Sequence, residues 1–302
     1  MNTEILLVGT GALATLYAAR LTAAGHPVTM LGTWQAGLDA LDRDGARLVD
    51  ADSREQVYRV RVTRDPEAAR GARIALVLVK SWQTERAAHQ LEKCLAGDGL
   101  AVTLQNGLGN DDILAEALGR ERVALGVTTT GATLLGPGLV QAGGEGMISL
   151  QLHPRLGGLE AALTDAHFQV EVVADAKSLV WGKLVVNAAI NPLTALLRVP
   201  NGELLRHPSA RIMMRALAEE TAAVACAQRV RLPFRNPLEA AESVARKTAS
   251  NHSSMFQDIR RGAPTEIDAI CGAVARTGER HGIPTPVNRV CWKLVHAIAS
   301  GR

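Results

Sequence analysis

Three polar residues, Lys183, Asn187 and Asn191, recur at four-residue spacing in an otherwise apolar segment. At about 100° of rotation per helical residue, each four-residue step advances only about 40° around the helix axis. The amine and the two carboxamides therefore share one narrow stripe, which we call the acid–amide stripe. A lysine among apolar neighbours is a candidate proton donor, because burial favours its neutral form. Carboxamides can orient a polar substrate without adding charge.

A different interpretation of this stripe remains open. A half-exposed helix face on which Lys and Asn simply meet water has the same spacing, and the spacing alone balances the two interpretations about evenly. The two interpretations differ in one respect: an active-site stripe requires that the same protein also bind a cofactor and a substrate.

The first thirty residues predict such a cofactor site. Residues 5–8 form an apolar run typical of a buried parallel strand, residues 12–24 have a helical pattern, and residues 28–31 form a second strand. Between the first strand and the helix lies a GxGxxA fingerprint: Gly9, Thr10, Gly11, Ala12, Leu13 and Ala14. Its glycines permit a tight turn and close approach of a pyrophosphate, and the helix N-terminus attracts the anion. The alternative is a glycine turn with a purely structural role.

Single residues at later strand ends are further candidates. Open α/β sheets bind ligands at the carboxyl ends of their strands. Thr33 follows the second strand, Lys80 follows an apolar run at residues 74–79, and Asn106 follows another at residues 101–104. Lys80 could instead be a solvated strand cap, and Asn106 could belong to an ordinary turn.

The chain of 302 residues is long enough for two domains. Up to about residue 170 the pattern favours a Rossmann-like α/β domain, with Gly-rich antiparallel strands or a hairpin within residues 136–151. From residue 171 to 302 the pattern favours long, Ala-rich helices interrupted by prolines. We therefore predict an α/β dinucleotide-binding domain at 1–170 and an all-helical substrate domain at 171–302. For the oligomeric state we expect a monomer or a homodimer.

Composition excludes several functional classes. A formal net charge of +3 is too weak to indicate a nucleic-acid partner. We predict that no stretch is long and apolar enough to span a bilayer, and we expect no membrane partner. The scattered cysteines form no CxxC pair, and no His has metal-ligand spacing, which predicts reduced thiols, no metal site and a cytoplasmic protein. The cysteines are Cys94, Cys226, Cys271 and Cys291.

Several further motifs, in order along the chain, resemble those of one family. They are Gly9–Leu13, Lys80–Gln83, Gln105–Gly107, Gly126–Thr129, Trp181–Lys183, Asn191–Ala195, Pro200–Leu204, Ser253–Asp258, Thr265–Asp268 and His281–Pro284. Their order and spacing resemble ketopantoate reductase (2-dehydropantoate 2-reductase) over essentially the full length. The first motif is generic to Rossmann enzymes, whereas the later ones are specific. The resemblance also implies a 6-phosphogluconate dehydrogenase-like arrangement of the two domains.

The resemblance implies NADPH-dependent reduction of ketopantoate to pantoate, a step toward pantothenate and coenzyme A. It implies that Lys183 is the general acid and that Glu266 is its acidic partner near the cofactor. The substrate contacts that it implies are Asn187, Asn191, Asn201, Asn251 and Ser254, with Ser254 facing the carboxylate. The nicotinamide-side cofactor contacts that it implies are Lys80, Asn106 and Ala132. From the residues alone, Glu266 is better explained as an exposed residue in the first turn of a helix capped by Thr265.

Two positions depart from the family. Members commonly carry Arg where Thr33 stands, so NADP(H) is the expected cofactor but NAD(H) stays open. Members commonly carry His where Thr130 stands, and we assign that position no role. Two rival functions also stay open: reduction of another branched 2-keto acid, and a catalytically idle NADPH-binding regulator. Such a regulator would not need Lys183 or Glu266.

Overall fold

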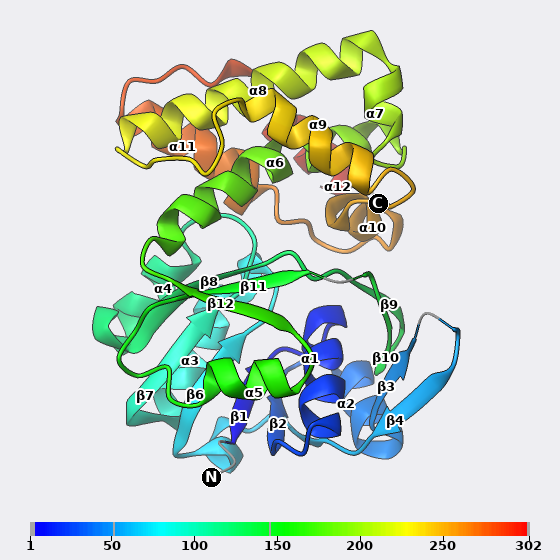
Figure 1. The fold of residues 1–302 in the computed structure, drawn as a ribbon, viewed down its shortest axis with the longest axis vertical. Helices are drawn as coiled ribbons and strands as arrows, with labels where there is room; N and C mark the ends of the chain where they lie inside the picture. The colour runs from blue at the N-terminus through cyan, green and yellow to red at the C-terminus, as the bar shows by residue number, and fades with distance from the viewer. Residues whose placement is uncertain (1–3, 51, 145, 301–302) are drawn as a thin grey trace. The chain divides into compact units, whose positions relative to one another are not determined.

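The computed structural model describes residues 4–50, 52–144 and 146–300, and the chain divides into two compact units (Figure 1). The first unit comprises residues 1–105 and 110–176, and the second comprises residues 106–109 and 177–302. The predicted class, a Rossmann-like α/β domain followed by a helical one, is confirmed. The first unit runs past residue 170 because a strand at Gln169–Val173 completes its sheet.

An eight-stranded sheet forms the framework of the first unit. In order across the sheet its strands are β12 (Gln169–Val173), β11 (Met147–Gln151), β8 (Val123–Thr128), β7 (Leu95–Thr103), β6 (Ala72–Val77), β1 (Ile5–Val8), β2 (Val28–Leu31) and β5 (Arg61–Thr63). All neighbouring pairs are parallel except β8 and β11. Parallel strands end at the same edge, so the residues after β1, β2, β5 and β6 emerge side by side.

Helices cover both faces of this sheet. They are α1 (Ala12–Ala23), α2 (Gln35–Asp44), α3 (Thr84–Cys94), α4 (Asn110–Leu118) and α5 (Leu159–Asp165), with short 3₁₀ turns η1 (Pro66–Ala69), η2 (Ser81–Gln83) and η3 (Arg120–Arg122). Successive side chains of a strand point to opposite faces. Accordingly, Ile5 and Leu7 of β1 pack in a cluster with α1 and α5, whereas Leu6 and Val8 pack in a cluster with α3 and α4.

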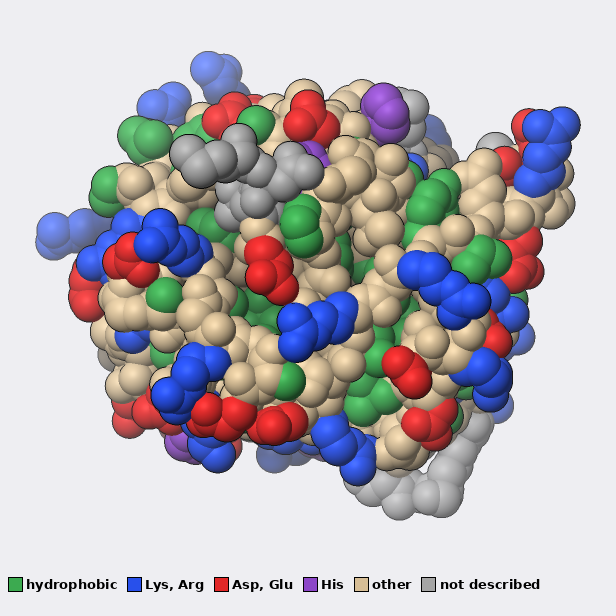
Figure 2. All heavy atoms as spheres, turned by 90° about the horizontal axis from the view of Figure 1, so that it is seen from below, with side chains coloured by type: hydrophobic (Ala, Val, Ile, Leu, Met, Phe, Trp, Pro, Cys, Tyr) green, Lys and Arg blue, Asp and Glu red, His purple; other side chains and the backbone are tan. Residues whose placement is uncertain are grey.

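A second, four-stranded sheet was not predicted from the sequence. Its order is β4 (Glu55–Tyr58), β3 (Ala46–Val49), β10 (Leu139–Ala142) and β9 (Ala132–Gly136). Antiparallel pairing occurs in the predicted region, but the hairpin, β9 and β10, spans residues 132–142 rather than lying within residues 136–151, and β11 pairs with β8 instead. β10 also pairs in parallel with β3, about ninety residues earlier in the chain. On the face that Figure 2 shows, acidic and basic side chains are interspersed and neither sign forms one continuous patch.

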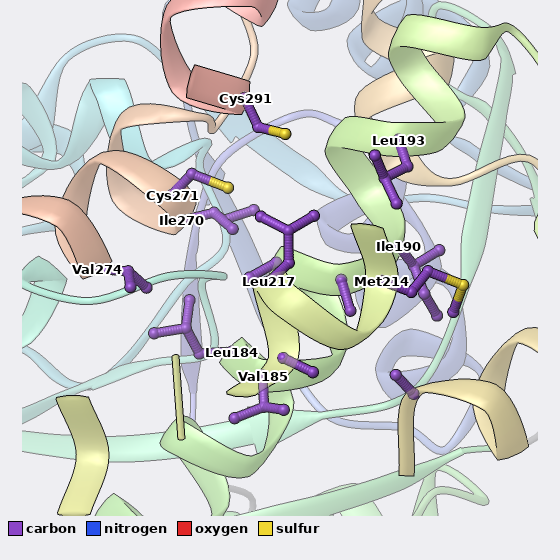
Figure 3. Packing of buried hydrophobic residues seen from close by; sticks show 14 of the residues in the cluster. Leu184, Val185, Ile190, Leu193, Met214, Leu217, Ile270, Cys271, Val274 and Cys291 are labelled. Atoms are coloured by element: carbon purple, nitrogen blue, oxygen red, sulfur yellow. The ribbon is translucent and has the colours of Figure 1, made fainter. Parts of the chain in front are cut away.

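The second unit is helical. Its elements are α6 (Ala176–Leu197), α7 (Glu203–Arg206), α8 (Pro208–Ala227), α9 (Pro237–Lys247), α10 (Ser254–Arg260), the π-helix η4 (Asp268–Gly272), α11 (Ala273–Arg280) and α12 (Pro286–Ser300). One core joins them: Leu184 and Val185 of α6 pack with Leu217 of α8, Cys271 of η4 and Cys291 of α12 (Figure 3). The central helix of this unit is therefore α6.

Helix α6 corrects one expectation. By length and composition it is apolar enough to cross a membrane, with 22 residues and a mean hydropathy of 1.3, so the prediction that no stretch qualifies is wrong. However, 67% of its most apolar window is buried inside the protein. A core helix of a folded domain has the same composition, because it is surrounded by apolar neighbours on most sides.

Candidate active site

The acid–amide stripe lies on α6, where the sequence predicted it. Lys183 and Asn187 are half-buried, and Asn191 is only 7% exposed. The intervening Leu184 and Val185 are almost fully buried in the core of the second unit. Packing of these apolar residues fixes the rotation of the helix, and with it the direction of the stripe. A freely solvated helix face is therefore not the environment of these three polar groups.

Lys183 is electrostatically unusual. Burial lowers the pKa of its ammonium group from the ordinary value of 10.5 to about 8, and the nearby carboxylate of Glu266 opposes that shift. Burial dominates because the charged amine loses hydration that a single carboxylate only partly replaces. An amine with a pKa near 8 is protonated at neutral pH yet releases its proton far more readily than an ordinary lysine does.

Glu266 is not the exposed helical residue that local sequence rules favour. Its side chain is 4% exposed, in a turn that leads into the π-helix η4 rather than in the first turn of an α-helix. Asn106 donates a hydrogen bond from its Nδ2 to Oε2 of Glu266, at 3.0 Å. Removing a carboxylate from water costs free energy unless other groups stabilise its charge. For Glu266, the amide of Asn106 and the positive charge of Lys183 both do so. The structure thus brings together Lys183, Glu266 and Asn106.

The segment Asn106–Gly109 is held against η4. The N–H of Leu108 donates to the carbonyl oxygen of Ala269 at 2.9 Å. Gly107 has φ of +86°, and a Cβ there would lie 2.4 Å from that same oxygen. Only glycine allows this approach, which explains why it follows Asn106. Asn106 consequently lies in the second unit, whereas the other nicotinamide-side candidates, Lys80 and Ala132, lie in the first.

A chain of buried hydroxyls ties the end of the stripe to the start of α10. The Oγ of Ser253 accepts from the N–H of Phe256 at 3.1 Å, as a helix N-cap does. Its own proton is free for Oγ1 of Thr194, which lies 2.7 Å away. The Thr194 hydroxyl then donates to the carbonyl oxygens of Ile190 and Asn191, at 3.1 and 3.0 Å. Pro192, which follows Asn191, has no N–H of its own, so this is the place where the helix is most easily bent.

A second set of hydrogen bonds fixes Asn201. The Thr248 hydroxyl donates to the carbonyl oxygen of Val244 at 2.8 Å, so it must accept from Asn201, whose Nδ2 lies 2.9 Å away. The side-chain orientation of Asn201 is thereby determined. Its Oδ1 is buried, and in the described part of the chain it has no hydrogen-bond partner. Asn201 Oδ1 is thus an acceptor available to a ligand hydroxyl.

Two other predicted substrate residues are exposed. Asn251 accepts from the N–H of Asn201 through its carbonyl oxygen at 2.9 Å, so it is tied to Asn201 by backbone. Ser254 is the first residue of α10, and the neighbouring Ser253 rather than Ser254 caps that helix. Backbone contacts and the hydroxyl chain therefore link the segments that carry Asn191, Asn201, Asn251 and Ser254.

Sequence rules gave no role to the residues that make these links. Thr194, Thr248 and Ser253 are distant from one another in sequence, and each is an ordinary helix or turn residue. A Ser directly before an apolar helical pattern, as at Ser253, is a local signal for an N-cap. The links depend on tertiary pairing, which periodicity does not encode.

The glycine loop of the first unit fits a dinucleotide. Gly9 has φ of +135°, and its N–H donates to the carbonyl oxygen of Leu31 at 2.8 Å, which extends the pairing of β1 with β2 by one residue. Gly11 precedes α1 without any side-chain cap, and a Cβ built on it meets no atom within 4 Å. Of the first residues of α1, Ala12 and Leu13 are partly exposed next to this space, whereas Ala14 is buried. Uncapped N–H groups at a helix start bind phosphates, and a side chain at Gly11 would fill the place of the anion.

The remaining candidates belong to the first unit. Thr33 is exposed after β2, Lys80 precedes η2 after β6, and Ala132 begins β9. The N–H of Thr130 donates to Oγ1 of Thr128 at 3.1 Å, but its own Oγ1 is buried without a partner among the described residues. Within those residues, no group of three or more His, Cys, Asp or Glu side chains is placed to hold a metal ion.

Comparison with known proteins gives matches over both units. The family model described as ketopantoate reductase PanE/ApbA matches residues 5–155, and the model of its C terminal matches residues 175–299. A 2-dehydropantoate 2-reductase of Archaeoglobus fulgidus is 38% identical over 303 residues, which cover 99% of this chain and 98% of the relative.

Solved structures with the same fold include enzymes with different names. A PanE/ApbA family ketopantoate reductase from Ralstonia eutropha has a TM-score of 0.91 at 33% identity, with 98% of both chains covered. A D-mandelate dehydrogenase, solved with NADH and anilino(oxo)acetate, has a TM-score of 0.92 at 25% identity, again with 98% of both chains covered. The fold is therefore shared by proteins named for different substrates.

Proposed function

The chain belongs to the ketopantoate reductase family, and from that premise we propose that it reduces 2-dehydropantoate to pantoate with NADPH, in the cytoplasm and toward pantothenate and coenzyme A. The observation that carries the proposal is the lowered pKa of Lys183, about 8, beside the buried carboxylate of Glu266. Ketone reduction builds negative charge on oxygen, and a poised ammonium group neutralises that charge as it forms.

Lys183 is the proton donor in this proposal. When the cofactor is bound, its nicotinamide supplies the hydride for the keto carbon. The Lys183 ammonium transfers a proton to the carbonyl oxygen, so the ketone becomes an alcohol and the lysine becomes a neutral amine. Solvent then returns a proton to the amine. Glu266 keeps the pKa of Lys183 from falling further, and Asn106 holds the carboxylate of Glu266.

The amides and the hydroxyl chain position the substrate. Asn187 and Asn191 lie on the same stripe as the acid and are proposed to bind the oxygens next to the reacting carbonyl. The free Oδ1 of Asn201 is proposed to accept from the single hydroxyl group of 2-dehydropantoate. Asn251 and Ser254 are proposed to lie toward its carboxylate. A site with a buried acceptor disfavours a substrate that lacks the matching donor.

We assign cofactor binding to residues of the first unit. The N-terminus of α1 and the space above Gly11 would hold the pyrophosphate. Lys80 and Ala132 are proposed to lie on the nicotinamide side, and Thr33 on the adenosine side. NADPH is the proposed electron donor, and the absence of a charge at Thr33 makes NADH the alternative.

A second candidate function is reduction of a different 2-keto acid. The likeness to D-mandelate dehydrogenase, a protein solved with NADH and an aryl oxo acid, favours this candidate. The same acid and amides would serve a bulkier substrate, because they act on the keto group rather than on the remainder of the molecule.

One assay separates these functions. Purified protein is given NADPH or NADH with 2-dehydropantoate, with 3,3-dimethyl-2-oxobutanoate, which lacks only the hydroxyl group, or with phenylglyoxylate. We expect kcat/KM to be highest for 2-dehydropantoate, and about tenfold to 1000-fold lower for the hydroxyl-free analogue. Faster reduction of phenylglyoxylate would replace the proposed substrate, and no nucleotide oxidation with any keto acid would contradict the proposed activity altogether.

A further inference from the structure

The adenosine side of the proposed cofactor site lacks a charged residue where one is expected. In dinucleotide-binding folds an acidic residue after the second strand binds the free ribose 2′-hydroxyl, and an arginine nearby binds a 2′-phosphate. Here Thr33 is exposed at that position, followed by Trp34 and by Gln35, the first residue of α2. The position itself therefore selects neither cofactor.

The neighbouring strand brings a charge to the same place. β5 lies beside β2 and runs parallel to it, with Thr63 opposite Leu31. The N–H of Gly32 donates to the carbonyl oxygen of Thr63 at 3.1 Å, so the two chains remain paired as they leave the sheet. Arg64 is the first residue after β5, and it therefore emerges at the same edge as Thr33.

The side chain of Arg64 is directed toward the start of α2. Its guanidinium donates from Nη2 to Oε1 of Gln35. Gln35 in turn donates from Nε2 to Asp39, one turn further along the helix, so the orientation of its amide is determined. Arg64 is thus held beside the first turn of α2 by a residue of that turn.

The charge of Arg64 is not neutralised by the protein. Among the described residues no carboxylate forms an ion pair with its guanidinium. The adjacent Asp65 is engaged otherwise, because its Oδ1 accepts from the N–H of Glu67 at 3.0 Å as the N-cap of η1. At the start of α2 the N-cap residue Trp34 provides no side-chain acceptor. A positive charge and uncapped N–H groups together favour an anion.

We infer that Arg64 is the specificity-determining residue that binds the 2′-phosphate of NADP(H), and that it replaces, from β5, an arginine at position 33. This inference rests on the proposed function, in which a nicotinamide dinucleotide binds the first unit. A planar guanidinium donates two parallel hydrogen bonds to a phosphate, a geometry that an uncharged ribose hydroxyl does not match. Arg64 therefore favours NADPH over NADH although Thr33 is neutral.

Binding measurements test this role without any keto acid. The dissociation constants of NADPH and NADH are measured by calorimetry with the full chain and with Arg64→Ala. We expect Arg64→Ala to weaken NADPH binding about 10- to 100-fold and to change NADH binding less than about twofold. Adenosine 2′,5′-bisphosphate, which carries the 2′-phosphate without nicotinamide, should lose affinity in the same proportion as NADPH.

Two further variants make the test specific. Arg61→Ala removes an exposed arginine of the same strand, whose Nη2 donates to the carbonyl oxygen of Ala68, and it should leave both affinities unchanged. The double variant Arg64→Ala with Thr33→Arg should recover the preference for NADPH, because the charge returns from the adjacent strand end.

Equal losses of NADPH and NADH affinity in Arg64→Ala, or a wild-type protein that binds NADH as tightly as NADPH, would overturn the inference. Failure of the proposed function has a different signature. A protein that binds NADPH through Arg64 but does not reduce 2-dehydropantoate would refute the substrate and leave the role of Arg64 standing.

Discussion

Around Lys183 in the second unit the polar groups are half-buried or buried side chains, and Asn106 is hydrogen-bonded to Glu266. Around Gly11 in the first unit they are backbone N–H groups at an uncapped helix start. The first arrangement alters a pKa, because it removes water and fixes a carboxylate near an amine. The second arrangement changes the pKa of no side chain. It provides space above Gly11 and the uncapped N-terminus of α1, where an anion can bind. Proton transfer and cofactor binding should therefore respond to different substitutions, and each can be disturbed while the other is retained.

The largest separation is expected from Lys183→Ala. Removal of the acid should lower kcat about 10²- to 10⁴-fold, the range for a positioned general acid. The dissociation constant of NADPH should change less than about twofold, because the glycine loop is untouched. Steady-state kinetics and calorimetry measure the two effects. Lys177→Ala, an exposed lysine on the same helix, is the matched control and should behave as wild type. An unchanged kcat in Lys183→Ala would contradict the assigned role.

The converse separation is expected from Gly11→Ala. The new Cβ would meet no protein atom within 4 Å, and Gly11 does not have a positive φ, so thermal stability should be retained. The methyl group would occupy the space proposed for the pyrophosphate, and NADPH affinity should fall about 10- to 100-fold. Gly97→Ala, also open around its Cβ but remote from the loop, is the control for stability and binding. Unchanged NADPH affinity in Gly11→Ala would place the pyrophosphate elsewhere.

Burial of Lys183 should also reduce stability in a pH-dependent manner. Its folded pKa, about 8, lies below the ordinary value of 10.5, so between these values the unfolded chain binds more protons and stability rises with pH. We compare Lys183→Met in a Glu266→Gln background with Glu266→Gln alone, which avoids leaving a buried carboxylate unpaired.

In that comparison the Lys183→Met protein should be more stable by about 1–3 kcal/mol at pH 7. The difference should shrink as the pH approaches 10.5, where the lysine is neutral in both states. Melting temperatures across this pH range measure it. If the difference in stability did not vary with pH, side-chain packing rather than ionisation of Lys183 would be its cause.

The smallest effect is expected from Thr194→Val. This change removes the hydroxyl that joins Ser253 to the carbonyls of Ile190 and Asn191, at a cost of about 1–2 kcal/mol. KM for 2-dehydropantoate should rise about three- to tenfold while kcat and NADPH affinity change less, because the link positions substrate residues rather than the acid. Thr194→Ser, which keeps the hydroxyl, should restore KM. Equal changes in kcat and KM would assign Thr194 a purely structural role.

Local patterns predicted much of this molecule. The βαβ unit with its glycine loop and the Lys183–Asn187–Asn191 stripe follow from periodicity and turn chemistry within about thirty residues. The four-stranded sheet was missed, because β3 and β4 are four residues each and β10 joins them from far along the chain. Burial of Glu266 was also unpredictable. Locally it resembles a solvated residue, and only its contacts with Asn106 and Lys183 explain a carboxylate that is 4% exposed.

Arg64 illustrates the same limit in the first unit. Sequence rules search for the 2′-phosphate residue directly after the second strand, whereas the guanidinium that we assign to this role follows β5, about thirty residues later. The paired strands, and not proximity in sequence, determine which side chains share a site.

The pH dependence of kcat/KM for 2-dehydropantoate tests the central claim, that Lys183 is the proton donor and Glu266 sets its pKa. In the wild type, kcat/KM should be constant below about pH 8 and fall about tenfold per pH unit above it, because only the ammonium form donates a proton. Glu266 raises the pKa of Lys183, so Glu266→Gln should move the start of this decline to lower pH. A wild-type profile without a decline above pH 8, or a decline that Glu266→Gln leaves in place, would contradict the account.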